Sequence, residues 1–258
     1  MTQTDIMLFS RLPLLLCLLV CGPAFSAAAE SGSFDVRAQL IARQTTILSS
    51  EIAGKVLQLP VREGEAFREW QEIVAIDCAA YRARLGQMDA QVNRATRKLE
   101  AQRLLDQRGA IGKMDLDFAE IDLDAAQAEQ QLAALDVSRC SIAAPFAGRV
   151  AERKVQRFQY VTVGQPIIDI LNDRDLEVEL LAPSRWLSWL KPGTAFVVRI
   201  DELGRDFPAI VTRIGPRIDP VSQSVKIYGR VDGEFTELMA GMSGLARLSP
   251  RAEAAIRQ

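Results

Sequence analysis

The amino-acid sequence predicts a mixed α+β protein of elongated, multi-module form. It combines a β-barrel with a split β module, and an antiparallel coiled-coil hairpin is inserted into that module. Three observations predict this fold class: an internal repeat, a helical pattern between the two copies, and a series of short strands after the second copy.

The internal repeat pairs residues 53–77 with residues 147–171 at a constant offset of 94. Six apolar or glycine pairs match without a gap, which is more than a chance alignment supplies. We therefore expect residues 48–78 and 138–172 to form the two halves of one sheet module. The matched pairs are Gly54 with Gly148, Val56 with Val150, Val61 with Val155, Phe67 with Val161, Ile73 with Ile167, and Ile76 with Ile170.

The insertion, residues 79–137, has the four-and-three apolar spacing of a two-stranded coiled coil. Gly109 and Gly112 separate its two helices, and a short link makes the second helix return antiparallel to the first. The predicted seam of the first helix is Tyr81, Leu85, Met88, Val92, Ala95 and Leu99. The predicted seam of the second helix is Phe118, Ile121, Ala125, Ala128, Leu132 and Leu135.

The other faces of both helices are rich in Arg, Gln, Asp and Glu. One interpretation is a solvated surface. The other is that further copies of the hairpin pack side by side into a tube. The sequence leaves both open.

Two cysteines, Cys78 and Cys140, lie where the two ends of the hairpin meet. We predict a disulfide between them, which would close a loop of some sixty residues and stabilise the fold by roughly 3–5 kcal/mol. The alternative is two small buried thiols.

Residues 173–248 have the alternating short strands and Pro/Gly turns of a small antiparallel barrel, with one short helical piece at Ser184–Leu190. Residues 34–47 contain a further strand, Phe34–Ala42, which can close that barrel. Residues 249–258 form a tail, so little chain follows the barrel. The predicted strands after residue 173 are Leu176–Leu181, Phe196–Ile200, Ala209–Ile214, Val225–Val231 and Gly244–Leu248.

The first 28 residues have the features of an export signal. Arg11 precedes the apolar run 12–20, and small residues at 24–29 offer cleavage sites. The alternative is an uncleaved amino-terminal anchor. The net charge of −2 argues against a nucleic-acid partner, and the absence of His removes the commonest general base and metal ligand. We therefore expect no enzyme.

Six motifs, each weak alone, occur in a specific order along the chain. They are AGKV at 53–56, RGAIGKMDLDFA at 108–119, IAAPFAGRV at 142–150, LKPG at 190–193, IDPVSQSV at 218–225 and LMAGM at 238–242. With these motifs the chain resembles the periplasmic adaptor, or membrane fusion, protein family of bacterial tripartite efflux systems.

The resemblance implies a split lipoyl-like domain, also called a barrel-sandwich hybrid, without a cofactor. It implies a periplasmic adaptor whose hairpin reaches an outer-membrane channel and whose barrel lies near an inner-membrane transporter, with self-association into rings of six. Channel docking would fall on the hairpin tip: Leu105, Arg108, Gly109, Ile111 and Gly112. Barrel contacts would fall on Arg205, Asp219, Pro220 and Ser222. The repeat itself contributes Gly54, Val56, Gly64, Gly148, Val150 and Gly164.

Several positions depart from the family pattern. Trp70 stands where the other half has Gly164, and Phe158 stands where the first half has Gly64. We expect altered turns there, with an exposed contact patch as the alternative. At the tip, Ala101 and Gly112 replace the Arg and Ser of many pump adaptors.

Three alternative functions are weighed against a pump adaptor. A lipoyl or biotin carrier needs a Lys at the tip between its halves, where this chain has Asp77 and Cys78. A metal-efflux adaptor needs a cluster of soft ligands, whereas Met88, Met114, Met239 and Met242 are scattered. An adaptor of an ABC-type exporter or secretion system remains, but the short hairpin favours a transporter of the resistance, nodulation and division (RND) type.

Overall fold

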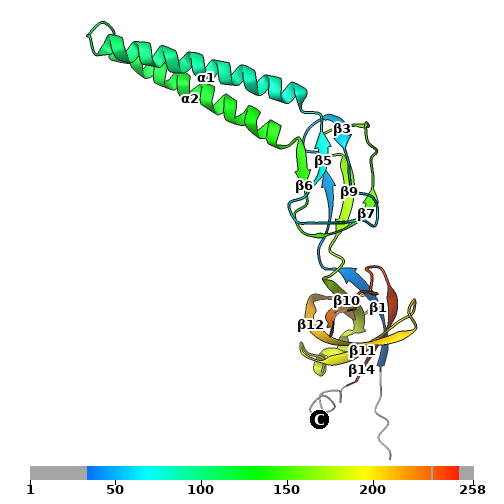
Figure 1. Cartoon of the computed structure of the whole chain (residues 1–258). Helices are drawn as coiled ribbons and strands as arrows, with labels where there is room; N and C mark the ends of the chain where they lie inside the picture. Colours follow the sequence, from blue (N-terminus) through cyan, green and yellow to red (C-terminus); the bar gives the residue numbers. More distant parts are fainter. Residues whose placement is uncertain (1–33, 234, 250–258) are drawn as a thin grey trace, which may run out of the picture. The chain divides into compact units, whose positions relative to one another are not determined.

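The computed structural model describes residues 34–233 and 235–249, which form two β modules and a pair of helices (Figure 1). Within these ranges, no helix is both long and apolar enough to cross a membrane. The predicted signal peptide, residues 1–28, and residues 250–258 of the predicted tail lie outside the described residues.

The split module consists of two four-stranded sheets that share one apolar core. One sheet has the order β2-β9-β7-β4 and the other has the order β6-β5-β3-β8. Val56, Ile73 and Ile167 are fully buried between them, and each such side chain stabilises the fold by about 1.5–3 kcal/mol. The strands are β2 Thr45–Ser49, β3 Gly54–Gln58, β4 Ala66–Phe67, β5 Glu72–Ile76, β6 Ser141–Ala143, β7 Gly148–Arg153, β8 Tyr160–Val161 and β9 Pro166–Leu171.

The sequence repeat is also a repeat of strands. At the offset of 94 residues, β3, β4 and β5 correspond to β7, β8 and β9. The shortest strand of each half pairs with a strand of the other half: β4 pairs with β7, and β8 pairs with β3. The equivalence extends upstream to β2 and β6, which the aligned residues did not include. The two halves are interlocked, and neither completes its sheet alone.

The boundary between the barrel and the split module lies earlier than we expected. We placed residues 34–47 in the barrel, but β2 belongs to the split module, where Thr45 lies opposite Leu171 of β9. A bend at Arg43 and Gln44 separates β1 from β2. Neither Gly nor Pro marks this bend, so the sequence pattern continues through it.

The barrel is closed, with strand order β1-β10-β13-β12-β11-β14. As predicted, β1 (Phe34–Ala42) closes it by pairing with β10 and β14. The apolar core includes Leu180, Phe207 and Ile227, which are fully buried. The other strands are β10 Leu176–Pro183, β11 Ala195–Ile200, β12 Arg205–Asp219, β13 Ser224–Val231 and β14 Ser243–Leu248.

Two barrel elements differ from their predicted form. The helical piece is a 3-10 helix, η1 (Ser184–Ser188), which buries Trp186 in the core. Strand β12 extends beyond the predicted Ala209–Ile214 at both ends. Its pairing with β13 has two irregularities, and the second, between Ile214 and Ile218, accommodates Gly215 and Pro216, since a bulge admits residues that a regular ladder excludes.

Helices α1 (Ala79–Asp106) and α2 (Lys113–Ser138) lie side by side (Figure 1). At 1.5 Å per residue, α1 is about 42 Å long. Polar contacts cross between the helices along this length. They join Lys98 to Asp122 at 2.6 Å, Arg103 to Glu120 at 3.0 Å, and Gln130 to Asp89 at 2.6 Å.

The seam predicted for α1 faces α2, as expected. The seam predicted for α2 is wrong. Ala95 and Leu99 of α1 are buried, as expected. On α2, however, Phe118, Ile121 and Leu132 are 55%, 60% and 66% exposed. Small residues allow two helices to approach closely, and the positions that face α1 carry several of them. These positions are Leu116, Ala119, Leu123, Ala126, Gln130, Ala133 and Val137.

Candidate functional site

The hairpin tip is an ordered loop between Asp106 and Lys113. Gly109 has φ 65°, its N–H donates to the Asp106 carbonyl at 2.8 Å, and the Ala110 N–H donates to the Leu105 carbonyl at 2.9 Å. This pair of bonds is a Schellman motif, which satisfies the last carbonyls of α1 and favours glycine at the left-handed position. At the start of α2, the Asp115 carboxylate accepts the Gly112 N–H at 3.3 Å.

The structure brings the predicted tip residues together on this loop and on the last turn of α1, which contains Leu105. Leu105, Arg108, Gly109 and Gly112 are exposed, and Ile111 is half-buried. The tip therefore presents an apolar side chain and a cation on a backbone that its own hydrogen bonds fix.

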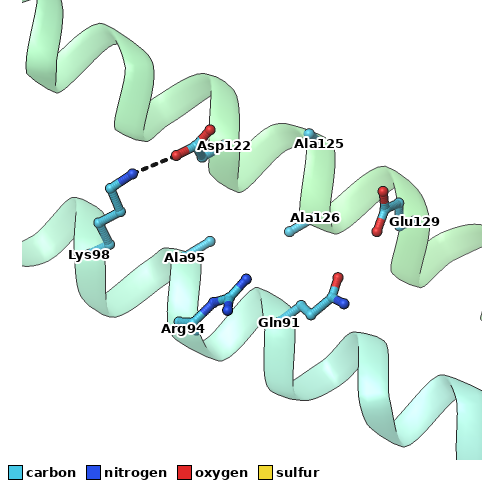
Figure 2. A pocket seen from close by; sticks show the side chains of 8 residues that line it. All are labelled: Gln91, Arg94, Ala95, Lys98, Asp122, Ala125, Ala126 and Glu129. Atoms are coloured by element: carbon cyan, nitrogen blue, oxygen red, sulfur yellow. Dashed lines mark hydrogen bonds and ion pairs between the residues drawn. The ribbon is translucent and has the colours of Figure 1, made fainter.

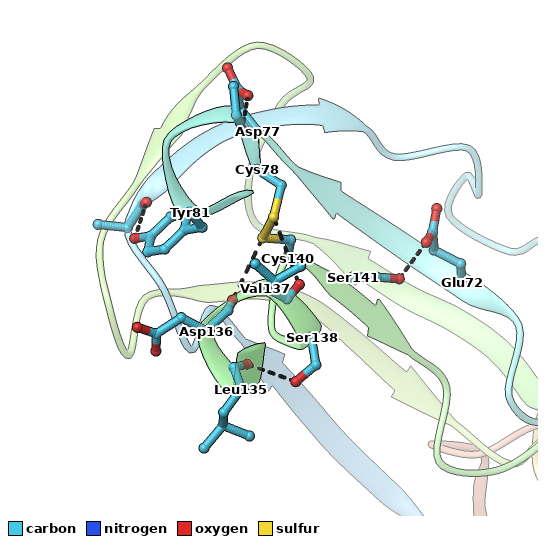
Figure 3. Close-up of a disulfide and its surroundings, with 12 residues drawn as sticks. Glu72, Asp77, Cys78, Tyr81, Leu135, Asp136, Val137, Ser138, Cys140 and Ser141 are labelled. Carbon is cyan, nitrogen blue, oxygen red and sulfur yellow. Dashed lines mark hydrogen bonds between the residues drawn. A yellow bond between two sulfur atoms is a disulfide. The ribbon is translucent and has the colours of Figure 1, made fainter. Parts of the chain in front are cut away.

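The base of the hairpin is tied to the split module by a covalent bond and by hydrogen bonds (Figure 3). Cys78 and Cys140 form a disulfide, with their Cα atoms 5.7 Å apart. The Ile76 N–H donates to the Cys140 carbonyl at 2.8 Å. The Tyr81 hydroxyl donates to the Ala53 carbonyl at 2.9 Å. Both helices are thus held at the point where they leave the sheet.

A charged contact that the sequence did not reveal adds to this base. Arg139 follows α2 and lies 3.1 Å from the Glu51 carboxylate and 3.4 Å from that of Asp136. Because these side chains are partly exposed, the pairs contribute at most about 1 kcal/mol each. They orient the end of α2 more than they stabilise the fold.

Four turns of the split module share one hydrogen-bonding scheme. In each, the N–H of the fourth residue donates to the first carbonyl, and the side chain of the fourth residue accepts the first N–H. At Arg62 and Glu65 these distances are 3.0 and 2.9 Å. The other three turns span residues 68–71, 156–159 and 162–165.

The aromatic residues keep the geometry of the glycine turns, so our expectation of altered turns is wrong. The third residue of each turn is left-handed, with φ 77° at Gly64, 79° at Gly164, 62° at Trp70 and 70° at Phe158. This conformation costs a residue with a side chain about 1–2 kcal/mol. Both aromatic rings are exposed, at 76% and 55%, and the Arg157 guanidinium lies 4.5 Å from the Phe158 ring.

The repeat residues serve the fold of the split module. Val56 and Val150 are buried at equivalent places in its core. Gly54 and Gly148 begin the equivalent strands β3 and β7, where both are buried. Together with the turn glycines Gly64 and Gly164, they position the sheets that carry the hairpin.

The predicted barrel contacts do not form one surface. Arg205 begins β12 and Asp219 ends it, so the strand separates them. Arg205 pairs with Glu237 at 3.0 Å. Asp219 accepts the Val221 and Ser222 N–H groups at 3.0 and 2.8 Å, which orders the turn that contains Pro220.

Hydrogen bonds to Asp219 lower the pKa of its carboxyl group. The Ser222 N–H is the main cause, followed by the Ser222 hydroxyl. Among the described residues, no group of three or more His, Cys, Asp or Glu side chains could hold a metal ion.

The family comparison matches residues 43–172 to a domain described as "RND MFP, barrel-sandwich hybrid domain". The match covers about half of the chain and contains the split module and the hairpin. An uncharacterized protein of Haemophilus influenzae is 27% identical over 208 residues, covering 80% of this chain and 54% of that protein. Nodulation protein NolF of Rhizobium meliloti is 26% identical over 210 residues, covering 76% and 57%.

This chain therefore spans little more than half the length of those two relatives. Among solved structures, it is similar in fold to a MacA-MexA chimeric protein that contains the Pseudomonas aeruginosa MexA α-hairpin domain. The TM-score is 0.74 at 19% identity, and the match covers 85% of this chain and 79% of the chimera.

Proposed function

The chain belongs to the membrane fusion, or periplasmic adaptor, protein family, and from this premise we propose that it is the adaptor subunit of a tripartite efflux pump. In the periplasm it links an inner-membrane transporter of the RND type to an outer-membrane channel, and its copies self-associate into a ring of six. It performs no reaction on the transported substrate.

This proposal rests on how the hairpin is attached to the split module. Helix α1 follows β5 and α2 precedes β6, and these two strands are neighbours in one sheet. The Cys78–Cys140 disulfide joins them at the same point. A helix pair that is fixed at its base and capped at its far end suits contact with a partner, because its tip is held in place.

The hairpin tip is the proposed channel-docking site. Leu105 and Arg108 are its main contacts, because Leu105 lies exposed in the last turn of α1 and Arg108 in the loop that the Schellman motif orders. Gly109, Ile111 and Gly112 shape the loop. Since Ala101 and Gly112 replace the usual Arg and Ser, recognition of the channel partner rests mainly on the apolar side chain of Leu105 and the cation of Arg108.

The two ends of β12 support two separate barrel contacts. Arg205, beside Glu237, belongs to one end. Asp219, Pro220 and Ser222 form the turn at the other end, where Val221 is 93% exposed. We assign the inner-membrane transporter to one of these ends and a neighbouring adaptor to the other.

A pull-down of the native full chain, cross-linked in its own membranes, tests the proposal. Mass spectrometry should identify an RND transporter and an outer-membrane channel. Recovery of an ATPase subunit would overturn the RND assignment, and recovery of neither kind of partner would overturn the adaptor role.

A charge reversal tests the tip. Arg108→Glu should reduce recovery of the channel and leave recovery of the transporter unchanged. Arg82→Glu, another exposed arginine near the base of α1, is the matched control. Equal recovery of the channel with both variants would contradict the tip assignment.

A further inference from the structure

The paired strands β3 and β8 of the split module carry an exposed aromatic and basic surface, which we call the β8 patch. Phe158 and Tyr160 are 55% and 65% exposed, and Leu57 is 38% exposed. Tyr160 lies opposite Lys55 in the pairing of β8 with β3. The Phe158 N–H donates to the Val56 carbonyl at 2.8 Å, which holds Phe158 beside the end of β3. The patch consists of Lys55, Leu57, Arg157, Phe158 and Tyr160.

Two cations of the patch share one aromatic ring. The Lys55 Nζ atom lies 5.2 Å from the centroid of the Phe158 ring, and the Arg157 guanidinium carbon lies 4.5 Å from it. Both distances are within the range of cation–π contacts. The Arg157 Nε–H also donates to the Leu57 carbonyl at 2.8 Å. Within the described residues, neither cation forms an ion pair with a carboxylate, so both positive charges are available to an anionic partner.

The other half of the split module shows that the fold does not require these side chains. The pairing of β4 with β7 repeats that of β8 with β3, since Ala66 lies opposite Arg149 as Tyr160 lies opposite Lys55. The same backbone is therefore built there with small residues in place of the aromatic ones. At the offset of 94, the equivalents of Lys55, Leu57, Arg157, Phe158 and Tyr160 are Arg149, Ala151, Glu63, Gly64 and Ala66.

The two equivalent surfaces also differ in charge. Arg149, which corresponds to Lys55, pairs with Asp173 at 2.9 Å. Glu63, which corresponds to Arg157, is a carboxylate in place of a cation. The equivalent surface thus has a neutralised cation and an acidic side chain, whereas the β8 patch has two free cations and no acidic side chain.

Phe158 adopts a backbone conformation that glycine adopts more readily. Its φ is 70°, and that of Gly64 in the equivalent turn is 77°. A side chain raises the energy of this left-handed conformation. The exposed ring adds little to the apolar core in return. Backbone strain that is kept at an exposed position is typical of sites that contact another molecule.

The β8 patch suits a macromolecule better than a small molecule. Small molecules bind in concave sites, and a groove of about 380 Å³ lies elsewhere, between the two helices of the hairpin (Figure 2). Arg94 and Lys98 line that groove together with Asp122 and Glu129, so its charges balance. The patch differs in both respects, because its side chains stand exposed on a sheet and its charge has one sign.

The residue types of the patch favour a protein partner over a membrane surface. Tyr, Phe and Arg are enriched at the centres of protein interfaces. Arg157 is oriented by its hydrogen bond and by the Phe158 ring, and an oriented guanidinium suits a carboxylate that approaches from a fixed direction. Recognition of an anionic membrane usually needs a cluster of about four to eight cations, and the patch has two.

We propose that the β8 patch binds an extended, acidic segment of a partner protein that also carries apolar side chains. Lys55 and Arg157 pair with Asp or Glu of the segment, and its apolar side chains pack on Leu57, Phe158 and Tyr160. An extended segment fits because β8 is an edge strand of its sheet, and sheet edges commonly recognise extended peptides. The inference goes beyond the adaptor role, since the patch lies apart from the hairpin tip and from both ends of β12.

A variant that copies the equivalent surface tests the proposal. It combines four substitutions: Leu57→Ala, Arg157→Glu, Phe158→Gly and Tyr160→Ala. This copying variant should fold, because the same residues already support the same turn and strand pairing in the other half. Folding is checked by urea denaturation beside the unmodified chain.

A display library of random linear peptides, selected on the unmodified full chain, provides the probe. Enriched peptides should be rich in Asp and Glu and should contain apolar residues. They should bind the copying variant about tenfold more weakly, as measured by fluorescence anisotropy. Peptides without acidic enrichment, peptides that bind both proteins equally, or no enrichment at all would overturn the proposal.

Two single variants separate binding from folding. Arg157→Glu should weaken binding of the enriched peptides about tenfold. Phe158→Gly should also weaken it without lowering the urea midpoint, because glycine accepts the left-handed conformation. A ring that served only the fold would instead lower the midpoint and leave binding unchanged. Arg94→Glu, an exposed arginine of the hairpin groove (Figure 2), is the matched control and should bind the peptides normally.

Vesicles distinguish a lipid partner from a protein partner. Sedimentation with phosphatidylglycerol vesicles should retain the unmodified chain and the copying variant equally. Retention that the copying variant loses would identify a lipid surface as the partner and overturn the proposal. The copying variant should still recover the transporter and the channel in the pull-down. Failure of the adaptor role would therefore leave the peptide result standing, and failure of the peptide result would leave the adaptor role standing.

Discussion

Trp70 and Gly164 occupy equivalent turns of the split module and share a left-handed backbone, with φ 62° and 79°. The Trp70 N–H donates to the Ala144 carbonyl at 2.9 Å, and the Gly164 N–H donates to the Ser50 carbonyl at 2.7 Å. Ala144 and Ser50 are themselves equivalent at the offset of 94. The surrounding strands therefore determine the backbone conformation of the turn, and the residue at its third position adopts the left-handed conformation whether or not it is glycine.

This relationship predicts that Trp70→Gly stabilises the protein. Glycine adopts the left-handed conformation without the steric cost that a side chain brings, so the free energy of unfolding should rise by about 0.5–1 kcal/mol. Urea denaturation measures the change. Trp70→Ala is the control, because it removes the exposed ring but keeps the strain. The prediction fails if the glycine variant is no more stable than the alanine variant.

The equivalent glycines of β3 and β7 should respond differently to the same substitution. A Cβ on Gly148 would clash with the carbonyl group of Leu171, which is backbone and cannot rotate away. A Cβ on Gly54 would meet Cγ2 of Ile76 at 2.6 Å, which is a side-chain atom that can shift. We expect Gly148→Ala to cost about 2–4 kcal/mol and Gly54→Ala about 1–2 kcal/mol. Thermal and urea unfolding of both variants would show whether this order holds.

The sequence predicted the split module well because the repeat imposes the same apolar pattern twice. It predicted the helices, the tip loop and the closed barrel for similar local reasons. The sequence did not reveal which of the two heptad series on α2 packs against α1. We favoured the series with the larger side chains, Phe118, Ile121 and Leu132. The series with Ala119, Ala126 and Ala133 faces α1, because close helix packing depends on small residues and on the partner's shape.

A matched pair of variants tests the observed seam of α2. Ala133 is buried against α1 and Leu132 beside it is 66% exposed. Ala133→Leu should therefore destabilise the chain by about 1–3 kcal/mol through overpacking. Leu132→Ala should change the free energy of unfolding by less than about 0.5 kcal/mol. If the seam predicted from the sequence were correct, Leu132→Ala would be the more destabilising variant. Unfolding of dilute protein therefore distinguishes the predicted seam from the observed one.

The disulfide at the hairpin base should contribute substantially to stability. Cys78 and Cys140 are separated by 62 positions, and closing a loop of that length is worth about 4 kcal/mol in the chain-entropy model. The double variant Cys78→Ala and Cys140→Ala should lose about this amount. The unmodified chain in reductant should lose a similar amount, and the double variant should not respond to reductant. Peptide mapping without reduction should recover the linked pair, and two alkylated peptides in its place would contradict the bond.

Asp219 makes the turn between β12 and β13 sensitive to acid. The Ser222 N–H, then the Ser222 hydroxyl, hold the pKa of this carboxyl below its ordinary 3.8. A lowered pKa means that the folded state favours the ionised form. Its contribution is therefore complete above the ordinary value and is lost as the pH falls through the lowered pKa.

Titration followed by NMR should accordingly give an apparent pKa below 3.8 for the Asp219 carboxyl, with the Val221 and Ser222 amide signals shifting in the same step. Asp219→Asn removes the titrating group, so this step should vanish from both amides. An apparent pKa at or above the ordinary value would contradict the hydrogen bonds. Because Val221 is 93% exposed at this turn, loss of the bonds releases an apolar side chain that the turn otherwise holds in place. Any partner that binds this turn should therefore bind more weakly at a pH below the lowered pKa, and the Asn variant should not show that dependence.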